Sequence, residues 1–358
     1  MESITNLTNL IFFLYPLCFI ISAFIITYLA IPKIVKYSIK MKIFDMPDER
    51  KEHKSPIPAL GGISIMAGLI PALIFLLYSY HNFESFVFVL GIFVLFITGV
   101  VDDIVLLSAS KRLFIQLAIS VLIVISGVKF PNLFGIFYIY EIPFFLLFLL
   151  NVIIITGIIN AFNLIDGING LAGGLGCISI FILGILLFIN KNIEYSIIAF
   201  SAATSYLAFL RYNLKPTFIF MGDNGSLVLG YLIAFFSLKL LQNPTHQSPE
   251  ESYTILKIVL SISSIPVFDA LRVFAGRILK NRSPFSPDKS HIHHLFIKKG
   301  FSHHKSSLVL YSFHVALILL AFIFKGIRIE FVFIINILLI SILISWLKIE
   351  KVNLKFKL

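Results

Sequence analysis

Residues 86–103 read FVFVLGIFVLFITGVVDD, a run of sixteen uncharged residues that ends in two aspartates. A helix needs about 20 residues to cross the hydrocarbon core of a membrane, and about 17 is a practical minimum. Ten further apolar runs cover 8–32, 59–80, 113–128, 143–162, 171–190, 195–210, 218–241, 254–275, 307–324 and 329–347. The pattern predicts an all-α, polytopic bundle of about 10–11 transmembrane helices.

The composition supports this reading, since 58% of the residues are hydrophobic and only 13% are charged. We expect one membrane domain over residues 1–358, with no soluble domain. The two cysteines, Cys18 and Cys177, both lie in apolar runs, which does not favour a disulfide framework. The net charge of +11 suggests nucleic-acid binding at first sight, but the membrane topology explains it better.

Lysine and arginine predict the orientation, because they concentrate in cytoplasmic loops. With the N-terminus outside, eleven spans put 23 of the 29 Lys and Arg residues inside. The chain is therefore expected to span a membrane with these loops in the cytoplasm, in contact with membrane lipid and with no nucleic-acid partner.

The polar residues gather in five islands that this topology puts on the cytoplasmic side. The islands are Asp45–Gly62, Asp102–Lys111, Asn160–Ala172, Gly222–Ser226 and Arg272–His294. A transporter, the rival class, predicts polar residues at mid-membrane depth. Because the span interiors are almost free of charge, the islands favour an active site at one membrane surface.

Three islands offer acids and amides for metal or substrate binding. Asp102 and Asp103 can hold a divalent cation, act as a base, or merely end a helix, and adjacent helical residues point about 100° apart. Asp223, between glycines, suits a metal or phosphate site, but an ordinary turn before a helix has the same pattern. A third group recurs every three residues, as in a helical face or a polar seam between helices: Asn160, Asn163, Asp166 and Asn169.

The remaining two islands are rich in cationic and imidazole groups. Arg277, His291, His293 and His294 suit phosphate recognition, although three histidines can also form a zinc site and the basic residues can attract anionic lipid. The segment from Asp45 to Gly62 mixes both charge signs with prolines and can position a charged head group.

Together the islands resemble the polyprenyl-phosphate N-acetylhexosamine-1-phosphate transferases of glycosyl transferase family 4. The resemblance covers about residues 45–295 and rests on five motifs in order. They are the Asp-x-Pro-x-x-Arg-Lys-x-His loop, the Asp102–Asp103 pair with Lys111, Asn-x-x-Asn-x-x-Asp-Gly-x-x-Gly-Leu-Ala, Gly-Asp-x-Gly-Ser and the histidine cluster. The form Ser-Pro-Phe-Ser-Pro-Asp-Lys-Ser-His-Ile-His-His is similar to the branch that transfers N-acetylglucosamine-1-phosphate (GlcNAc-1-phosphate) to undecaprenyl phosphate.

The resemblance implies a Mg²⁺-dependent phosphotransferase of the bacterial inner (cytoplasmic) membrane, with Mn²⁺ as an alternative. A UDP-N-acetylhexosamine would donate the sugar phosphate to undecaprenyl phosphate and release UMP, at the start of cell-envelope polysaccharide synthesis such as that of lipopolysaccharide or O-antigen. A deoxy sugar nucleotide and the muramoyl-pentapeptide nucleotide remain alternative donors, and a homodimer is compatible with the sequence.

By the same resemblance, Asp223 and Asn163 are the expected metal ligands, and Asp102 is the carboxylate that deprotonates or orients the lipid phosphate, supported by Asp103. The residue at Asn169 is aspartate in most bacterial relatives, so this chain lacks one charge there. The expected substrate-binding residues are Lys51, His53, Lys111, Asn160, Asp166, Asn169, Arg277, His291, His293 and His294.

Overall fold

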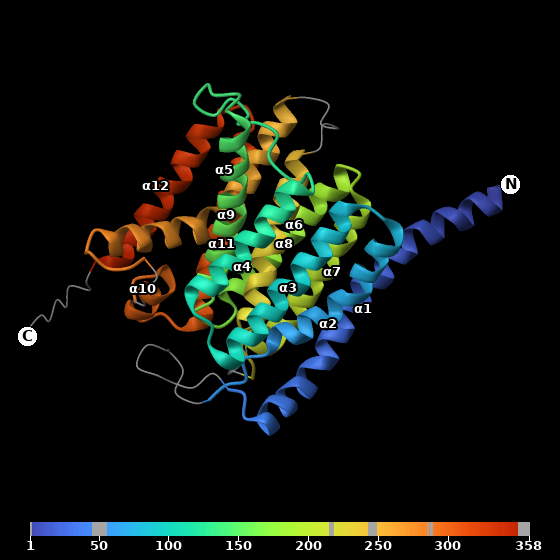
Figure 1. Ribbon diagram of the computed structural model, residues 1–358, viewed down its shortest axis with the longest axis horizontal. Coiled ribbons are helices and arrows are strands. Elements are labelled where there is room, and N and C mark those ends of the chain that lie inside the picture. Colours follow the sequence, from blue (N-terminus) through green and yellow to red (C-terminus); the bar gives the residue numbers. More distant parts are fainter. Residues whose placement is uncertain are drawn as a thin grey trace, which may run out of the picture.

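The computed structural model describes residues 2–44, 56–214, 218–242, 249–284, 286 and 289–349. This part of the chain forms twelve helices and no β-strand (Figure 1). Their bounds are α1 (Glu2–Met41), α2 (Gly61–Ser79), α3 (Phe83–Val105), α4 (Ala109–Ile125), α5 (Phe144–Leu164), α6 (Leu171–Ile189), α7 (Ile193–Asn213), α8 (Asp223–Gln242), α9 (Pro249–Ile278), α10 (Ile292–Lys298), α11 (His303–Ile323) and α12 (Ile329–Lys348).

The predicted all-α bundle is confirmed, and each of the eleven apolar runs forms one helix. Within the described residues, ten helices are long and apolar enough to span a membrane. The remaining run, 113–128, forms α4, whose 17 residues are about the practical minimum for a membrane span. The additional helix, α10, has seven residues and lies in the histidine-rich segment.

Helix α8 lies at the centre of the bundle and packs against α2, α3, α5 and α6. It is buried along almost its whole length, as expected for a helix that is apolar on all sides. Helices α1 and α12 instead expose large apolar side chains such as Leu29 and Ile342, which suits a surface in contact with lipid. The most buried helix therefore carries Asp223 at its first position.

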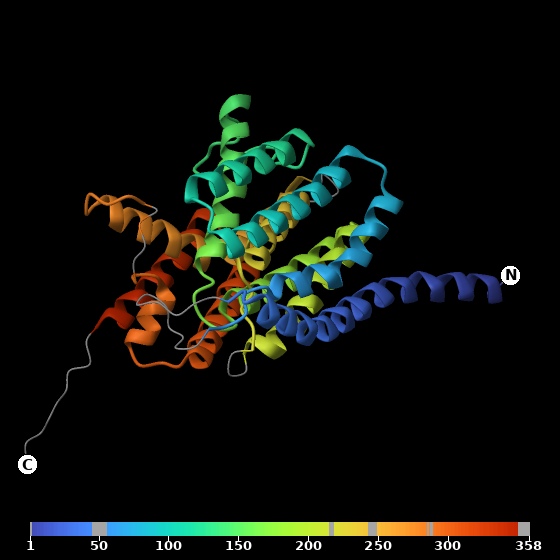
Figure 2. The ribbon, with the colours of Figure 1, turned by 60° about the horizontal axis from the view of Figure 1, so that its bottom comes forward.

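Successive helices run in opposite directions, so the polar islands meet at one end of the bundle. In Figure 1 this is the lower end, where α3 and α5 finish and where α4 and α8 begin. In Figure 2, α4 and α5 rise away from the rest of the bundle, whereas their ends beside the islands stay packed against it. The fold thus brings segments that are more than a hundred residues apart into one site.

Helix α9 contains Pro266, which lacks the N–H group that would continue the helical hydrogen bonding. Kinks in helices occur most often at proline. Figure 1 shows the C-terminal part of α9 projecting sideways from the bundle, with α10 below it. This projecting part forms one side of the site described next.

Candidate active site

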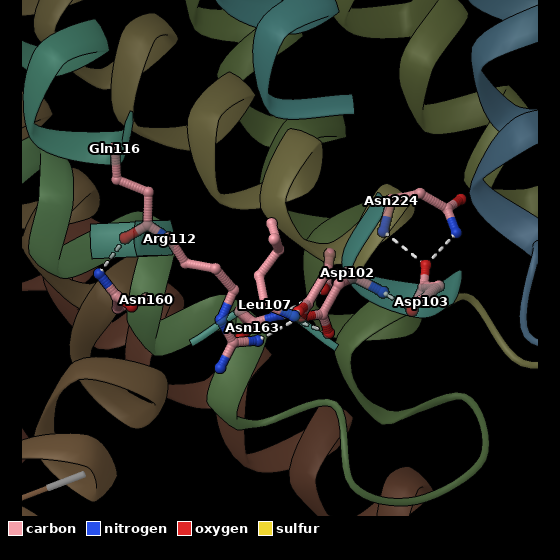
Figure 3. A network of polar contacts seen from close by, with 10 residues as sticks. Asp102, Asp103, Leu107, Arg112, Gln116, Asn160, Asn163 and Asn224 are labelled. Carbon is pink, nitrogen blue, oxygen red and sulfur yellow. Dashed lines mark hydrogen bonds and ion pairs between the residues drawn. The ribbon is translucent and has the colours of Figure 1, made fainter. Parts of the chain in front are cut away.

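The centre of the site is an arginine between two carboxylates that come from different helices. Arg112 Nη1 lies 2.7 Å from Asp102 Oδ2 and 2.5 Å from Asp223 Oδ2. Asp102 is buried, whereas Arg112 and Asp223 are partly exposed. The N–H of Leu107 donates to Asp102 Oδ1 at 2.5 Å and so fixes the turn between α3 and α4 (Figure 3). The positively charged guanidinium therefore lies between the two carboxylates and pairs with both of them.

Asp103 faces in a different direction from Asp102 and holds the beginning of α8. Its carboxylate accepts hydrogen bonds from the backbone N–H groups of Asp223 and Asn224 at 3.0 and 3.1 Å, and from Asn224 Nδ2 at 2.5 Å (Figure 3). The first N–H groups of a helix have no partner inside the helix, and a carboxylate there is stabilising. Asp103 therefore positions Asp223.

Gly222, which precedes α8, allows the backbone at the start of α8 to approach Asp103 closely. Its φ of +75° favours glycine, and a Cβ atom there would lie 2.1 Å from the carbonyl oxygen of Ala59 and 2.6 Å from Asp103 Oδ2. The glycine before Asp223 in the sequence motif is thus required by the geometry of the turn.

The end of α5 and the turn that follows it add an amide and a fourth acid. Asn163 Nδ2 donates to Asp223 Oδ1 at 3.0 Å and to Ser226 Oγ at 2.8 Å. Burial, together with the charges of Asp223 and Asp103, raises the pKa of the Asp166 carboxyl to about 8. Asp166 is therefore mostly protonated near pH 7, and a cation bound among these acids would favour its ionised form.

The other two amides of this segment have different surroundings. Asn160 donates to Gln116 Oε1 on α4 (Figure 3). It also donates to the carbonyl oxygen of Thr156 at 2.9 Å. Asn169 is half-buried, and its carbonyl oxygen accepts from Ser307 Oγ at 2.9 Å. Asn160 therefore joins α4 to α5, and the backbone of Asn169 ties this segment to α11.

The histidine cluster packs directly against the Asp166–Gly167 turn. A Cβ atom on Gly167 would lie 2.1 Å from His293 Nε2, so only glycine leaves room for the ring. Burial, then the neighbouring His294 and His291, lowers the pKa of His293 to about 3. His293 is thus neutral near pH 7 and contacts the turn, whereas His294 is more exposed.

A pocket of about 650 Å³ opens between α4, α5, α9 and α10. Its size suits a small-molecule ligand. None of its described lining residues is acidic, and those that carry a cationic or imidazole group are Arg112, Arg277, Lys289, His291, His293 and His294. The pocket is therefore suited to an anion, while Asp102 and Asp223 contact the same arginine that lines it.

The structure thus brings together most of the residues that the sequence predicted. Lys111 is exposed, and its neighbour Arg112 contacts the acids instead. Lys51 and His53 lie outside the described residues. Sequence reasoning missed Arg112 and Gln116, because adjacent positions on α4 differ in direction by about 100° and no motif distinguishes them.

Comparison with known proteins agrees with this geometry. Residues 85–241 match the model of glycosyl transferase family 4. A probable undecaprenyl-phosphate N-acetylglucosaminyl 1-phosphate transferase of Bacillus subtilis is 34% identical over 353 residues, which cover 94% of each chain. The chain belongs to glycosyl transferase family 4. Undecaprenyl-phosphate alpha-N-acetylglucosaminyl 1-phosphate transferases of Escherichia coli K12 and Yersinia pestis are 31% and 30% identical, over 79% and 84% of this chain and 77% and 80% of their own lengths.

Membership of family 4 confirms the family that the motifs indicated, and it makes the protein a multi-pass membrane enzyme of the phosphotransferase type. The matched range 85–241 begins in α3 and ends in α8, so it includes both carboxylates that contact Arg112. The histidine cluster lies beyond that range, within the longer alignment to the Bacillus relative.

Proposed function

We propose that this protein transfers GlcNAc-1-phosphate from UDP-GlcNAc to undecaprenyl phosphate. The products are undecaprenyl diphosphate GlcNAc and UMP. The observation that carries the proposal is the pocket with a cationic wall, beside two acids that share one arginine. The names of the relatives support the acceptor and the transferred group.

In the proposed reaction, an oxygen of the lipid phosphate attacks the β-phosphorus of the nucleotide sugar. The bond from that phosphorus to the bridging oxygen breaks, and UMP leaves with the oxygen and its electron pair. Phosphoryl transfer depends mainly on positioning and on electrostatic stabilisation of the phosphate oxygens. Arg112, Arg277 and His294 would supply positive charge from the pocket wall, and Asp102 would orient the incoming lipid phosphate.

We propose Mg²⁺ as the cofactor, held by Asp223 and Asn163. Among the residues that the structure describes, no three His, Cys, Asp or Glu side chains form a metal-binding group. One carboxylate and one amide oxygen nevertheless suit Mg²⁺, which is usually held by one or two carboxylates together with substrate phosphates and water. The Arg112 guanidinium already binds Asp223 as a cation would. When bound, Mg²⁺ would neutralise the diphosphate and the departing UMP.

His293 has a different proposed role from its neighbours. Because its ring is neutral and packs on Gly167, it supports the turn that carries Asp166. His291 and His294 are the imidazoles that we assign to phosphate binding.

A panel of UDP-sugars tests the proposed donor. Purified protein with undecaprenyl phosphate should release UMP fastest from UDP-GlcNAc. Faster release from another UDP-N-acetylhexosamine, such as a deoxy sugar or the muramoyl-pentapeptide nucleotide, would replace the donor but keep the reaction. A protein that releases no UMP from any of them would contradict the proposed function.

The active site is proposed to face the cytoplasm, because the nucleotide sugar is made there and the lipid tail stays in the bilayer. The product would then be the first lipid-linked sugar of a cell-envelope polysaccharide.

Cysteine labelling tests this orientation. In a variant with Cys18 and Cys177 replaced by serine, Ser110→Cys should react only with a membrane-impermeant reagent on the cytoplasmic side. Glu141→Cys, which lies in the exposed loop at the opposite end of the bundle, should react only from outside. The reverse pattern would overturn the orientation.

A further inference from the structure

Asp269 is a buried carboxylate that does not line the pocket and has no role in the reaction described above. It lies on α9, three residues after Pro266, and only 1% of its side chain is exposed. A buried charge is costly unless it is paired and hydrogen-bonded. The contacts that stabilise the buried Asp269 carboxylate therefore indicate its structural role.

Together with those of Arg272, these contacts tie the start of α10 to α9. Asp269 Oδ2 lies 2.9 Å from His291 Nδ1, and Asp269 Oδ1 accepts from the backbone N–H of Ile292 at 3.0 Å. Arg272 Nη2 donates to Asp269 Oδ1 at 2.6 Å and to the carbonyl oxygen of Ser290 at 2.5 Å. Asp269 thus fixes the ring of His291 and the backbone after it, while Arg272, which is paired with Asp269, holds the backbone before it.

The contact at Nδ1 also selects the atom that His291 offers to the pocket. A carboxylate acceptor keeps a proton on Nδ1, and the remaining nitrogen, Nε2, lies on the opposite side of the ring. His291 lines the pocket, together with Arg112 and Asn163. When the ring also carries a proton on Nε2, that N–H group can donate a hydrogen bond to a phosphate oxygen.

We propose that Asp269 is a positioning residue that acts through His291 and holds Nε2 toward the diphosphate of the nucleotide sugar. This inference rests on the proposed function and extends it to a residue on α9. It distinguishes the three histidines: His293 supports the Gly167 turn, whereas His291 binds substrate in an orientation that Asp269 determines.

Asp269→Asn is the most informative substitution, because the amide keeps the size of the side chain and one acceptor but removes the charge. Loss of a carboxylate that orients a metal-ligating histidine typically costs about 10–100-fold in affinity or activity, and we expect an effect at the lower end for a histidine that binds phosphate. We expect the Kd of UDP-GlcNAc, measured by titration calorimetry without lipid phosphate, to rise about tenfold. The KM for undecaprenyl phosphate should stay within about twofold of its original value.

A double-mutant cycle separates this role from a general loss of structure. His291→Ala should also weaken UDP-GlcNAc binding, and Asp269→Asn should add little in the His291→Ala background. Glu84→Gln is the matched control, because Glu84 forms a partly buried ion pair with Lys239 at 2.6 Å on the opposite end of the bundle. That control should lower thermal stability and leave the Kd unchanged.

Two results would overturn the inference while leaving the proposed function intact. One is a wild-type protein that releases UMP, combined with additive effects of Asp269→Asn and His291→Ala on the Kd. The other is an Asp269→Asn variant with an unchanged Kd. A wild-type protein that releases no UMP from any UDP-sugar would overturn the proposed function, and the inference with it.

Discussion

The Asp223→Asn variant is expected to release UMP at least about a thousandfold more slowly than the wild-type protein. A catalytic metal ion contributes several kcal/mol to the transition state, and each 1.36 kcal/mol corresponds to a factor of ten in rate. The substitution removes the charge that faces Arg112 and the proposed Mg²⁺, while Asn163 Nδ2 can still donate to an amide oxygen at this position. Initial rates of UMP release, measured over a range of Mg²⁺ concentrations, test this expectation.

Glu330→Gln is a suitable control for this experiment, since it removes a buried carboxylate near the opposite end of the bundle. Glu330 accepts from the backbone N–H of Phe137 at 2.7 Å and pairs with Arg328 at 2.6 Å. Its loss should affect thermal stability more than the rate. An Asp223→Asn protein that is folded and fully active would rule out Asp223 as the metal ligand.

The second large effect is expected from Arg112→Ala, which should lower UMP release by about a hundredfold. Removal of one preorganised donor that stabilises transition-state charge lowers kcat by about 10²–10³, and the partial exposure of Arg112 places the expected loss at the lower end. Without the guanidinium, Asp102 and Asp223 lose their shared cation, and the pocket wall loses a phosphate-binding group.

Lys111→Ala provides the matched comparison on the same helix. Lys111 is exposed, so its loss should change the rate by about twofold or less. A larger loss of UMP release for Lys111→Ala than for Arg112→Ala would contradict the site geometry and restore the residue that the sequence motif suggested.

The helices could be predicted from the sequence because each one satisfies a simple physical requirement. In a bilayer, backbone polar groups must bond within the segment, so an apolar run of sufficient length becomes a helix. Run 113–128 was marginal by length, and it forms α4, whose 17 residues are the fewest of any described helix except α10. The N-terminus outside and the cytoplasmic loops stay predictions, since they depend on a membrane.

The contacts within the site required the three-dimensional structure. The sequence indicated that Asp102 and Asp103 need not share a role, and their side chains do contact different helices. It could not choose between Lys111 and Arg112. The neutral state of His293 depends on the burial of its ring, which packs against Gly167, 126 residues away in the chain. Asp269 lies in an apolar helix and meets His291 only because α9 and α10 fold together.

The most direct test of the central claim follows the β-phosphate. UDP-GlcNAc radiolabelled at that phosphate should be incubated with the purified protein, undecaprenyl phosphate and Mg²⁺. If the protein transfers GlcNAc-1-phosphate, the label moves into the lipid fraction in equal amount to the UMP released. Label that remains in UDP while the sugar moves to the lipid, or label that does not move at all, would contradict the account.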